Sequence, residues 1–232
     1  MKKNQSVLIL GANSLIGQAL AEEFSKKNHD LILCLRKSDR LYSFSKNLES
    51  KYKNKVILLN FDILEVNYFE DFFKNLPIVP KVIISTIGIM NQPEKNAEYT
   101  IKNIINTNYV NQVVFFEIAS KYLISKNTFS TIIIFGSVAG IRGRKKNYIY
   151  GSSKAGLHCY LSGLRQKYSK DNLNIITFIP GYMDTNMLET KTKANANNFL
   201  ITKPDKVAKI IYKSFLYRRS IVYTPFWRYI IL

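Results

Sequence analysis

Residues 7–17 read Val-Leu-Ile-Leu-Gly-Ala-Asn-Ser-Leu-Ile-Gly. The four leading apolar residues are typical of a short strand that is buried on both faces. A turn with Gly11 and Gly17 follows, and residues 19–24 continue with a helical pattern. A strand, a glycine turn and a helix in this order place backbone N–H groups where they can bind a pyrophosphate. We therefore expect Gly11 to permit a tight turn and Gly17 to permit close packing of the helix on the strand.

The rest of the chain alternates between short apolar runs and helical patterns. This alternation predicts an α/β fold of the Rossmann type, a doubly wound parallel sheet of about seven strands with helices on both faces, in a three-layer sandwich. The predicted strands are 6–10, 31–35, 56–60, 81–86, 131–136, 174–179 and, more weakly marked, 220–223. The predicted helices are 14–27, 39–53, 66–75, 97–125, 150–170 and 204–217.

The composition is that of one globular domain over residues 1–232. Hydrophobic residues make up 47% of the chain, which is enough for one large core, and no Gly/Ser-rich or Pro-rich linker divides it. No run reaches the roughly 18 apolar residues of a membrane-spanning helix. The two cysteines lack metal-ligand spacing and the two histidines are too few for a metal site. We therefore expect a cytoplasmic protein without a metal.

Three side chains of complementary chemistry stand at consistent spacings. Tyr150 and Lys154 lie four residues apart in a predicted helix and share one face. An ammonium group in that position can lower the pKa of Tyr150 from about 10 toward neutrality. Ser137 follows the apolar run 131–135, so its hydroxyl should project from the end of a buried strand. The pattern predicts that Tyr150 exchanges a proton with a carbonyl or alcohol oxygen that Ser137 also binds. The alternative is a surface helix with an ordinary Tyr–Lys pair.

With these motifs, the chain resembles the short-chain dehydrogenase/reductase family, classical type, over roughly residues 5–190. The matching motifs are the turn 11–17, Asp62 in 60–63, Ser85-Thr86-Ile87-Gly88, Asn108 in 106–110, the residues Ser137, Tyr150 and Lys154, and the Pro-Gly-x-x-x-Thr segment 180–185. The resemblance implies an oxidoreductase that moves a hydride between a nicotinamide dinucleotide and a carbonyl/alcohol pair. The chain departs from the family at Leu10, Leu15 and Ser85-Thr86, where Thr, Gly and Asn-Asn are usual.

The resemblance also implies roles for residues. Tyr150 would be the acid or base, Lys154 would lower its pKa and bind the nicotinamide ribose, and Ser137 would orient the substrate oxygen. Asn108 would hold a water that links Lys154 to solvent. The implied cofactor-binding residues are Gly11, Asn13, Ser14, Leu15, Ile16, Gly17, Arg36, Asp62, Ile63, Thr86, Ile87, Gly88, Tyr150, Lys154, Pro180, Gly181, Met183 and Thr185.

The end of the second predicted strand bears on the choice of dinucleotide. A site specific for NAD(H) needs an acidic side chain there to accept hydrogen bonds from the ribose, but Leu35 occupies that position. Arg36 follows, and its guanidinium can bind a 2′-phosphate through two charge-assisted hydrogen bonds. Lys37 and Arg40 add positive charge. We therefore expect NADP(H) in preference to NAD(H).

Within the family, the sequence looks most similar to keto-sugar reductases of the decaprenylphosphoryl-2-keto-ribose reductase type. The similar features are residues 88–92, Leu15 and residues 223–228. They imply a lipid-linked or nucleotide-linked keto-sugar as the substrate. Two alternatives stay open: a reductase of acyl-chain or other small ketones, and a non-catalytic Rossmann protein that senses NADP.

Two segments lie outside these motifs. Residues 188–203 are polar with little periodicity, which fits a substrate flap or a plain surface loop. Residues 215–232 combine aromatic, basic and aliphatic side chains, as interfacial anchors do. That segment predicts peripheral contact with the inner membrane surface, a subunit contact, or a last strand packed on the core. The segment stops within an apolar run, and truncation of the C-terminus would also produce such an ending.

The net charge of +18 could attract nucleic acid, but the lysines are spread along the chain and no nucleic-acid motif is present. We attribute the charge mainly to compositional bias and expect no nucleic-acid partner. The expected partner is a small-molecule ketone or alcohol. By resemblance, helices 97–125 and 150–170 would form a homodimer or homotetramer.

Overall fold

Seven parallel strands form the central sheet of the computed structural model, which describes residues 5–90, 97–185 and 201–225. Across the sheet the order is β3-β2-β1-β4-β5-β6-β9. The strands are β1 (Ser6–Leu10), β2 (Asp30–Leu35), β3 (Val56–Asn60), β4 (Val82–Ser85), β5 (Ser130–Phe135), β6 (Leu173–Pro180) and β9 (Ile221–Thr224). The order reverses between β1 and β4, and such sheets bind ligands beyond the carboxyl ends of the strands at that reversal. The predicted Rossmann-type parallel sheet is confirmed.

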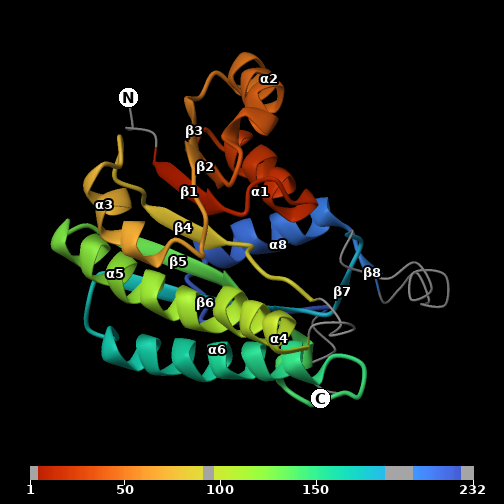
Figure 1. Cartoon of the computed structure of the whole chain (residues 1–232). Coiled ribbons are helices and arrows are strands. Elements are labelled where there is room, and N and C mark those ends of the chain that lie inside the picture. The colour runs from red at the N-terminus through yellow and green to blue at the C-terminus, as the bar shows by residue number, and fades with distance from the viewer. Residues whose placement is uncertain (1–4, 91–96, 186–200, 226–232) are drawn as a thin grey trace.

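Helices cover both faces of the sheet (Figure 1). One layer contains α1 (Leu15–Ser25), α2 (Tyr42–Tyr52) and α8 (Pro204–Leu216), and the other contains α3 (Phe69–Lys74), α4 (Ala97–Ile105), α5 (Asn111–Ser125) and α6 (Tyr148–Lys167). Alternate residues of β1 enter the two cores: Val7 and Ile9 pack under α1 and α8, and Leu8 and Leu10 pack under α5 and α6. This burial on both faces explains why the strands are continuous apolar runs.

The predicted helix 97–125 is divided in the structure. A π-helical turn, η3 (Asn106–Val110), separates α4 from α5. π turns are often found at functional sites. Asn108 lies within this turn and is fully buried, so the interruption determines how a predicted site residue is presented.

Both segments outside the motifs, 188–203 and 215–232, have structure in their described parts. Ile201–Thr202 forms β8, which pairs with β7 (Tyr182–Met183), and Lys203 is the N-cap residue of α8. Backbone pairing and the start of α8 thus hold residues 201–203. Residues 188–200 lie outside the described residues, and a substrate flap over 188–203 stays a prediction. Ile221–Thr224 forms β9 as the last strand of the sheet, and residues 226–232 of the predicted membrane segment are not described. Within the described ranges, no helix is both long and apolar enough to cross a bilayer.

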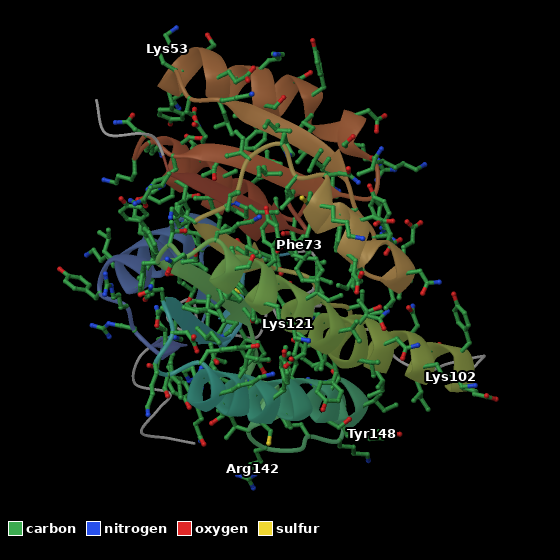
Figure 2. All side chains as sticks on the ribbon, turned by 90° about the vertical axis from the view of Figure 1, so that its left-hand side faces the viewer. Lys53, Phe73, Lys102, Lys121, Arg142 and Tyr148 are labelled. Atoms are coloured by element: carbon green, nitrogen blue, oxygen red, sulfur yellow. The ribbon has the colours of Figure 1, made fainter. Side chains whose placement is uncertain are left out.

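An aromatic cluster joins the sheet to α3 and α5. Phe115 is fully buried, and its ring centroid lies 5.1–6.2 Å from those of five other phenylalanines. Figure 2 shows one of them, Phe73, in the interior of the molecule, whereas Lys53 extends outward from it. The cluster includes Phe61, which directly precedes Asp62, so it also fixes the start of a predicted binding loop.

Truncation of Phe115 should destabilise the fold strongly. We expect Phe115→Ala to lower the free energy of unfolding by about 3–5 kcal/mol, because it removes transfer energy and leaves a cavity. Lys121→Ala, at an exposed position of the same helix, should change it by no more than about 0.5 kcal/mol. Urea denaturation followed by circular dichroism measures both values. A Phe115→Ala value as small as that of Lys121→Ala would contradict the importance of the cluster.

Candidate active site

The turn between β1 and α1 requires glycine at two positions. Gly11 has a φ angle of +76°, which side-chain-bearing residues rarely adopt, and a Cβ there would lie 2.7 Å from Thr86 Oγ1. A Cβ on Gly17 would lie 2.7 Å from the Gly11 carbonyl oxygen. The structure therefore confirms that Gly11 permits the tight turn and that Gly17 permits close packing of α1 on β1. The turn brings the start of α1 against the end of β1.

Ser14 organises this turn. Its hydroxyl accepts a hydrogen bond from the Gly17 N–H and donates one to the Gly11 carbonyl, each at 2.9 Å. The same oxygen lies 3.2 Å from Thr86 Oγ1, and Thr86 in turn donates to the Leu10 carbonyl at 3.0 Å. The turn is thus tied to the end of β4. Leu15, at the position of the usual middle glycine, is 46% exposed and begins α1.

A small pocket of about 260 Å³ lies beyond the carboxyl ends of β2 and β3. Leu35 is buried at the end of β2, so it offers no hydrogen-bond acceptor there. The lining residues are Arg36, Asn60, Phe61, Asp62, Glu65 and Tyr68. Arg36 and Asp62, both predicted cofactor residues, therefore lie in one pocket, together with the carboxylate of Glu65. Ile63 is buried beside it, and its carbonyl accepts a hydrogen bond from Asn111.

The side chain of Asn108 joins three parts of the site. Its Oδ1 accepts a hydrogen bond from the Ile89 N–H, and its Nδ2 donates to the Ile89 carbonyl, both at 2.8 Å. Nδ2 also lies 3.1 Å from the Ser153 hydroxyl on α6. These bonds hold the segment after β4 against α6. They are structural contacts, and the role of Asn108 in a water relay stays a prediction.

Lys154 is buried against the end of β5. Its ammonium group donates a hydrogen bond to the Phe135 carbonyl at 3.0 Å, and the side chain is only 2% exposed. Burial lowers the pKa of Lys154 to about 8. Gly88 faces the ammonium group, since a Cβ on Gly88 would lie 3.3 Å from Lys154 Nζ. The absence of a side chain at Gly88 leaves room above the lysine.

Tyr150 and Ser137 lie together as the sequence predicts, but the pKa of Tyr150 shifts in the opposite direction from the predicted one. A hydrogen bond joins their side chains. Burial raises the pKa of the Tyr150 hydroxyl, and the bond to Ser137 only partly offsets the rise. Lys154 Nζ lies 5.9 Å from the centre of the Tyr150 ring. The prediction that the protein's own Lys154 brings the Tyr150 pKa toward neutrality is therefore wrong, because desolvation outweighs the other effects.

His158 is a site residue that the sequence reasoning missed. The Ser137 N–H donates a hydrogen bond to His158 Nε2 at 3.2 Å. A Cβ on Gly136 would overlap that imidazole, so the glycine is required for the approach. Burial, and then the charge of Lys154, lower the pKa of His158 to about 4. The available signal was its position one helical turn after Lys154.

One cavity of about 400 Å³ collects most of these groups beyond the carboxyl ends of the strands. Among the predicted site residues it is lined by Thr86, Ile87, Gly88, Ser137, Tyr150, Lys154, Pro180, Gly181, Met183 and Thr185. The predicted residues at 11–17, 36, 62, 63 and 108 do not line it. The sequence reasoning missed several of its lining residues, among them Met90, Asn147, Tyr182 and the cations Arg144, Lys145 and Lys146. A dense run of basic residues at 142–146 was the signal for the cations.

The residues present fit a dinucleotide. The Gly11 turn is closed to a Cβ yet places the start of α1 at the sheet edge, where the first N–H groups of a helix lack partners within the helix. From this turn, the pocket with Arg36 lies on one side of the sheet reversal and the cavity with Lys154 on the other. These two places suit the adenosine half and the nicotinamide half of such a cofactor.

Comparison with known proteins agrees with this geometry. An uncharacterized oxidoreductase of Mycobacterium tuberculosis is 27% identical over 231 residues, which cover 94% of this chain and 88% of the relative. The NADP-dependent 3-hydroxy acid dehydrogenase of Schizosaccharomyces pombe is 26% identical over 232 residues, with 94% and 89% covered. The solved short-chain dehydrogenase from Sphingobium yanoikuyae in complex with NADPH superimposes with a TM-score of 0.82 at 23% identity, covering 95% of this chain and 88% of the other.

Residues 5–196 match the protein family described as short chain dehydrogenase. The matched range begins before the Gly11 turn and includes Ser137, Tyr150, Lys154 and the segment 180–185. Because this range covers most of the sequence and contains both the glycine turn and the residues that line the cavity, the chain belongs to the short-chain dehydrogenase family.

Proposed function

We propose that this oxidoreductase reduces a ketone with NADPH and that Tyr150 is the general acid. One observation carries the proposal: the Tyr150 hydroxyl, its hydrogen-bond partner Ser137 and the buried ammonium group of Lys154 line one cavity. The substrate oxygen would lie between the two hydroxyls. The bound cofactor would supply the hydride.

The electrostatics of Tyr150 favour the reductive direction. A raised pKa keeps the phenol protonated near neutral pH, and reduction needs a proton donor at the carbonyl oxygen. As that proton leaves, the Lys154 ammonium nearby would stabilise the phenolate. Ser137 would hold the substrate oxygen, and His158 would hold Ser137 by accepting its backbone N–H. In this proposal Asn108 supports the site through Ile89 and Ser153 and would also bind the relay water.

For the cofactor, we propose NADP(H) over NAD(H). Support comes from Arg36 in the pocket beyond β2, from the buried apolar Leu35, and from relatives whose names or ligands include NADP or NADPH. Asp62 and Glu65 in the same pocket oppose part of the positive charge. In the turn, the pyrophosphate would be bound by the backbone N–H groups of Asn13, Leu15 and Ile16. The N–H of Ser14 donates to the Gly11 carbonyl and would hold the turn in shape.

For the substrate, we propose a lipid-linked or nucleotide-linked keto-sugar. Apolar and polar side chains line the cavity together, which suits a substrate that carries both a polar sugar and an apolar group. Reduction of an acyl-chain ketone is the second candidate, supported by Met90, Val138 and Met183 in the lining. A non-catalytic sensor would not need Ser137, Tyr150 and Lys154 in this arrangement.

We also propose a single-domain cytoplasmic protein that forms a homodimer or homotetramer through the layer of α4, α5 and α6. Phe116, Leu157 and Leu161 are fully buried within the chain, so they belong to its own core, and other residues of these helices would form the contact. Peripheral membrane contact by residues 215–232 is supported by the exposed side chains of Leu216 and Tyr217.

Removal of the Tyr150 hydroxyl should abolish most turnover. We expect Tyr150→Phe to bind NADPH normally and to lower kcat for ketone reduction by about 10²–10⁴-fold, the usual contribution of a general acid. Tyr148→Phe, at an exposed position two residues earlier, is the matched control and should behave as the wild type. NADPH oxidation with a panel of keto-sugars, acyl ketones and small ketones measures the rates. Unchanged kcat in Tyr150→Phe would overturn the assignment.

The dinucleotide preference should depend on Arg36. We expect NADPH to bind at least about tenfold more tightly than NADH, or about 1.4 kcal/mol. Arg36→Ala should remove most of this preference, and Arg40→Ala, a charge change outside the pocket, should retain it. Fluorescence titration with both reduced cofactors gives the Kd values. Equal binding of the two cofactors by the wild type would contradict the proposal.

His158 should make the protein sensitive to acid. The folded state keeps His158 neutral down to about pH 4, whereas the unfolded chain binds a proton near 6.5. The unfolded state therefore binds more protons between these values, and stability falls as the pH drops from 6.5 to 4. Across this pH range, we expect the free energy of unfolding of His158→Gln to fall by up to about 3 kcal/mol less than that of the wild type. Urea denaturation at each pH tests this expectation, and equal losses in the two proteins would contradict it.

A further inference from the structure

The cavity has a strongly basic wall beside Tyr150 and Ser137. Arg144, Lys145 and Lys146, in the loop that leads into α6, all line it. None of the described lining residues is an aspartate or glutamate. The side chains of Arg144 and Lys145 form no ion pair with any carboxylate of the described residues.

General composition does not account for this wall. Lysine and arginine make up 34 of the 232 residues, or about one in seven, whereas residues 142–146 read Arg-Gly-Arg-Lys-Lys. Neighbouring like charges repel one another, so folding does not favour their gathering at one cavity. A concave, partly apolar wall concentrates the field of such charges and raises the local concentration of anions.

The phosphates of the proposed cofactor do not require these cations. The pocket with Arg36 shares no lining residue with the cavity and lies at the ends of β2 and β3. The pyrophosphate is assigned to the Gly11 turn at the end of β1. The loop 142–146 follows β5 and precedes α6, and Arg144, Lys145 and Lys146 line the cavity together with Ser137 and Tyr150. Its charge therefore faces the space left for the substrate.

We infer that the substrate is an anionic ketone whose carboxylate or phosphate is bound by Arg144 and Lys145, with its keto group at Ser137 and Tyr150. This inference rests on the proposed function and adds the charge of the substrate to it. A guanidinium group binds carboxylate and phosphate oxygens through two parallel hydrogen bonds, and an ammonium group adds a point charge. Met90, Val138 and Met183 provide the apolar surface for the carbon atoms between the anion and the ketone. A neutral ketone of the same shape has no anionic group that could pair with the cations of the basic wall.

Paired substrates test the charge. Acetoacetate would be compared with ethyl acetoacetate, and dihydroxyacetone phosphate with dihydroxyacetone, so the two arms separate carboxylate from phosphate. We expect at least one anion to have a kcat/KM about tenfold or more above that of its neutral partner. Arg144→Gln with Lys145→Gln should reduce this ratio at least about fivefold, mainly through KM, since the groups act in binding.

Arg142→Gln is the matched control. It changes the charge of the same loop, but Arg142 does not line the cavity and its side chain extends outward from the molecule (Figure 2). We expect it to keep the wild-type ratio. If Arg142→Gln lowers the ratio as much as the Arg144→Gln/Lys145→Gln variant does, the preference comes from overall charge, and the inference is wrong.

Binding measurements separate this inference from the proposed function. The same four compounds would be titrated by calorimetry into the wild type and the Arg144→Gln/Lys145→Gln variant, each saturated with NADP+. Preferential binding of an anion that is lost in the variant would support the inference even without turnover. Turnover of neutral and anionic ketones with equal efficiency would overturn the inference and leave the reductase proposal standing. If no ketone is reduced or bound, both fail.

Discussion

Burial of the parallel sheet on both faces confines the polar chemistry of this protein to the ends of its strands. Every residue of β1, β4 and β5 is buried, and an unpaired polar group in such a strand would be costly. The residues that turn the backbone or offer a hydroxyl to the site follow the strand ends, at Gly11, Thr86 and Ser137. Because all seven strands are parallel, those ends lie along one edge, and the candidate active site forms there.

The buried ammonium group of Lys154 links the sheet to the site. It is satisfied by the carbonyl of Phe135, the last residue of β5, so α6 is held at the sheet edge where Ser137 emerges. The same desolvation lowers the pKa of Lys154 and raises that of Tyr150. Burial thus stabilises the protonated phenol, which a proton donor for reduction requires, whereas it disfavours the charged form of Lys154.

The functional effect of the many positive charges depends on where they lie in the structure. Most of the cations lie on the exposed surface, where single charges and ion pairs have little energetic effect. Arg36 and the cations Arg144, Lys145 and Lys146 differ because they line two separate pockets beyond the carboxyl ends of the strands. In the proposed function the first binds the 2′-phosphate of the cofactor, and the second binds an anion on the substrate. The reactive centre would then be aligned by two separate charge contacts.

The fold could be predicted from the sequence, because the burial of alternating strands and helices leaves a periodic apolar pattern along the chain. The sequence also showed which residue types stand at the ends of β1, β5 and β6, and so the family. Tertiary structure alone decided the π turn at Asn108, the pairing of β7 with β8, the contact of His158 with Ser137 and the inward position of Arg144 and Lys145. It also reversed the expected direction of the Tyr150 pKa. These features depend on contacts and desolvation between segments far apart in the chain, and no local pattern of residues records them.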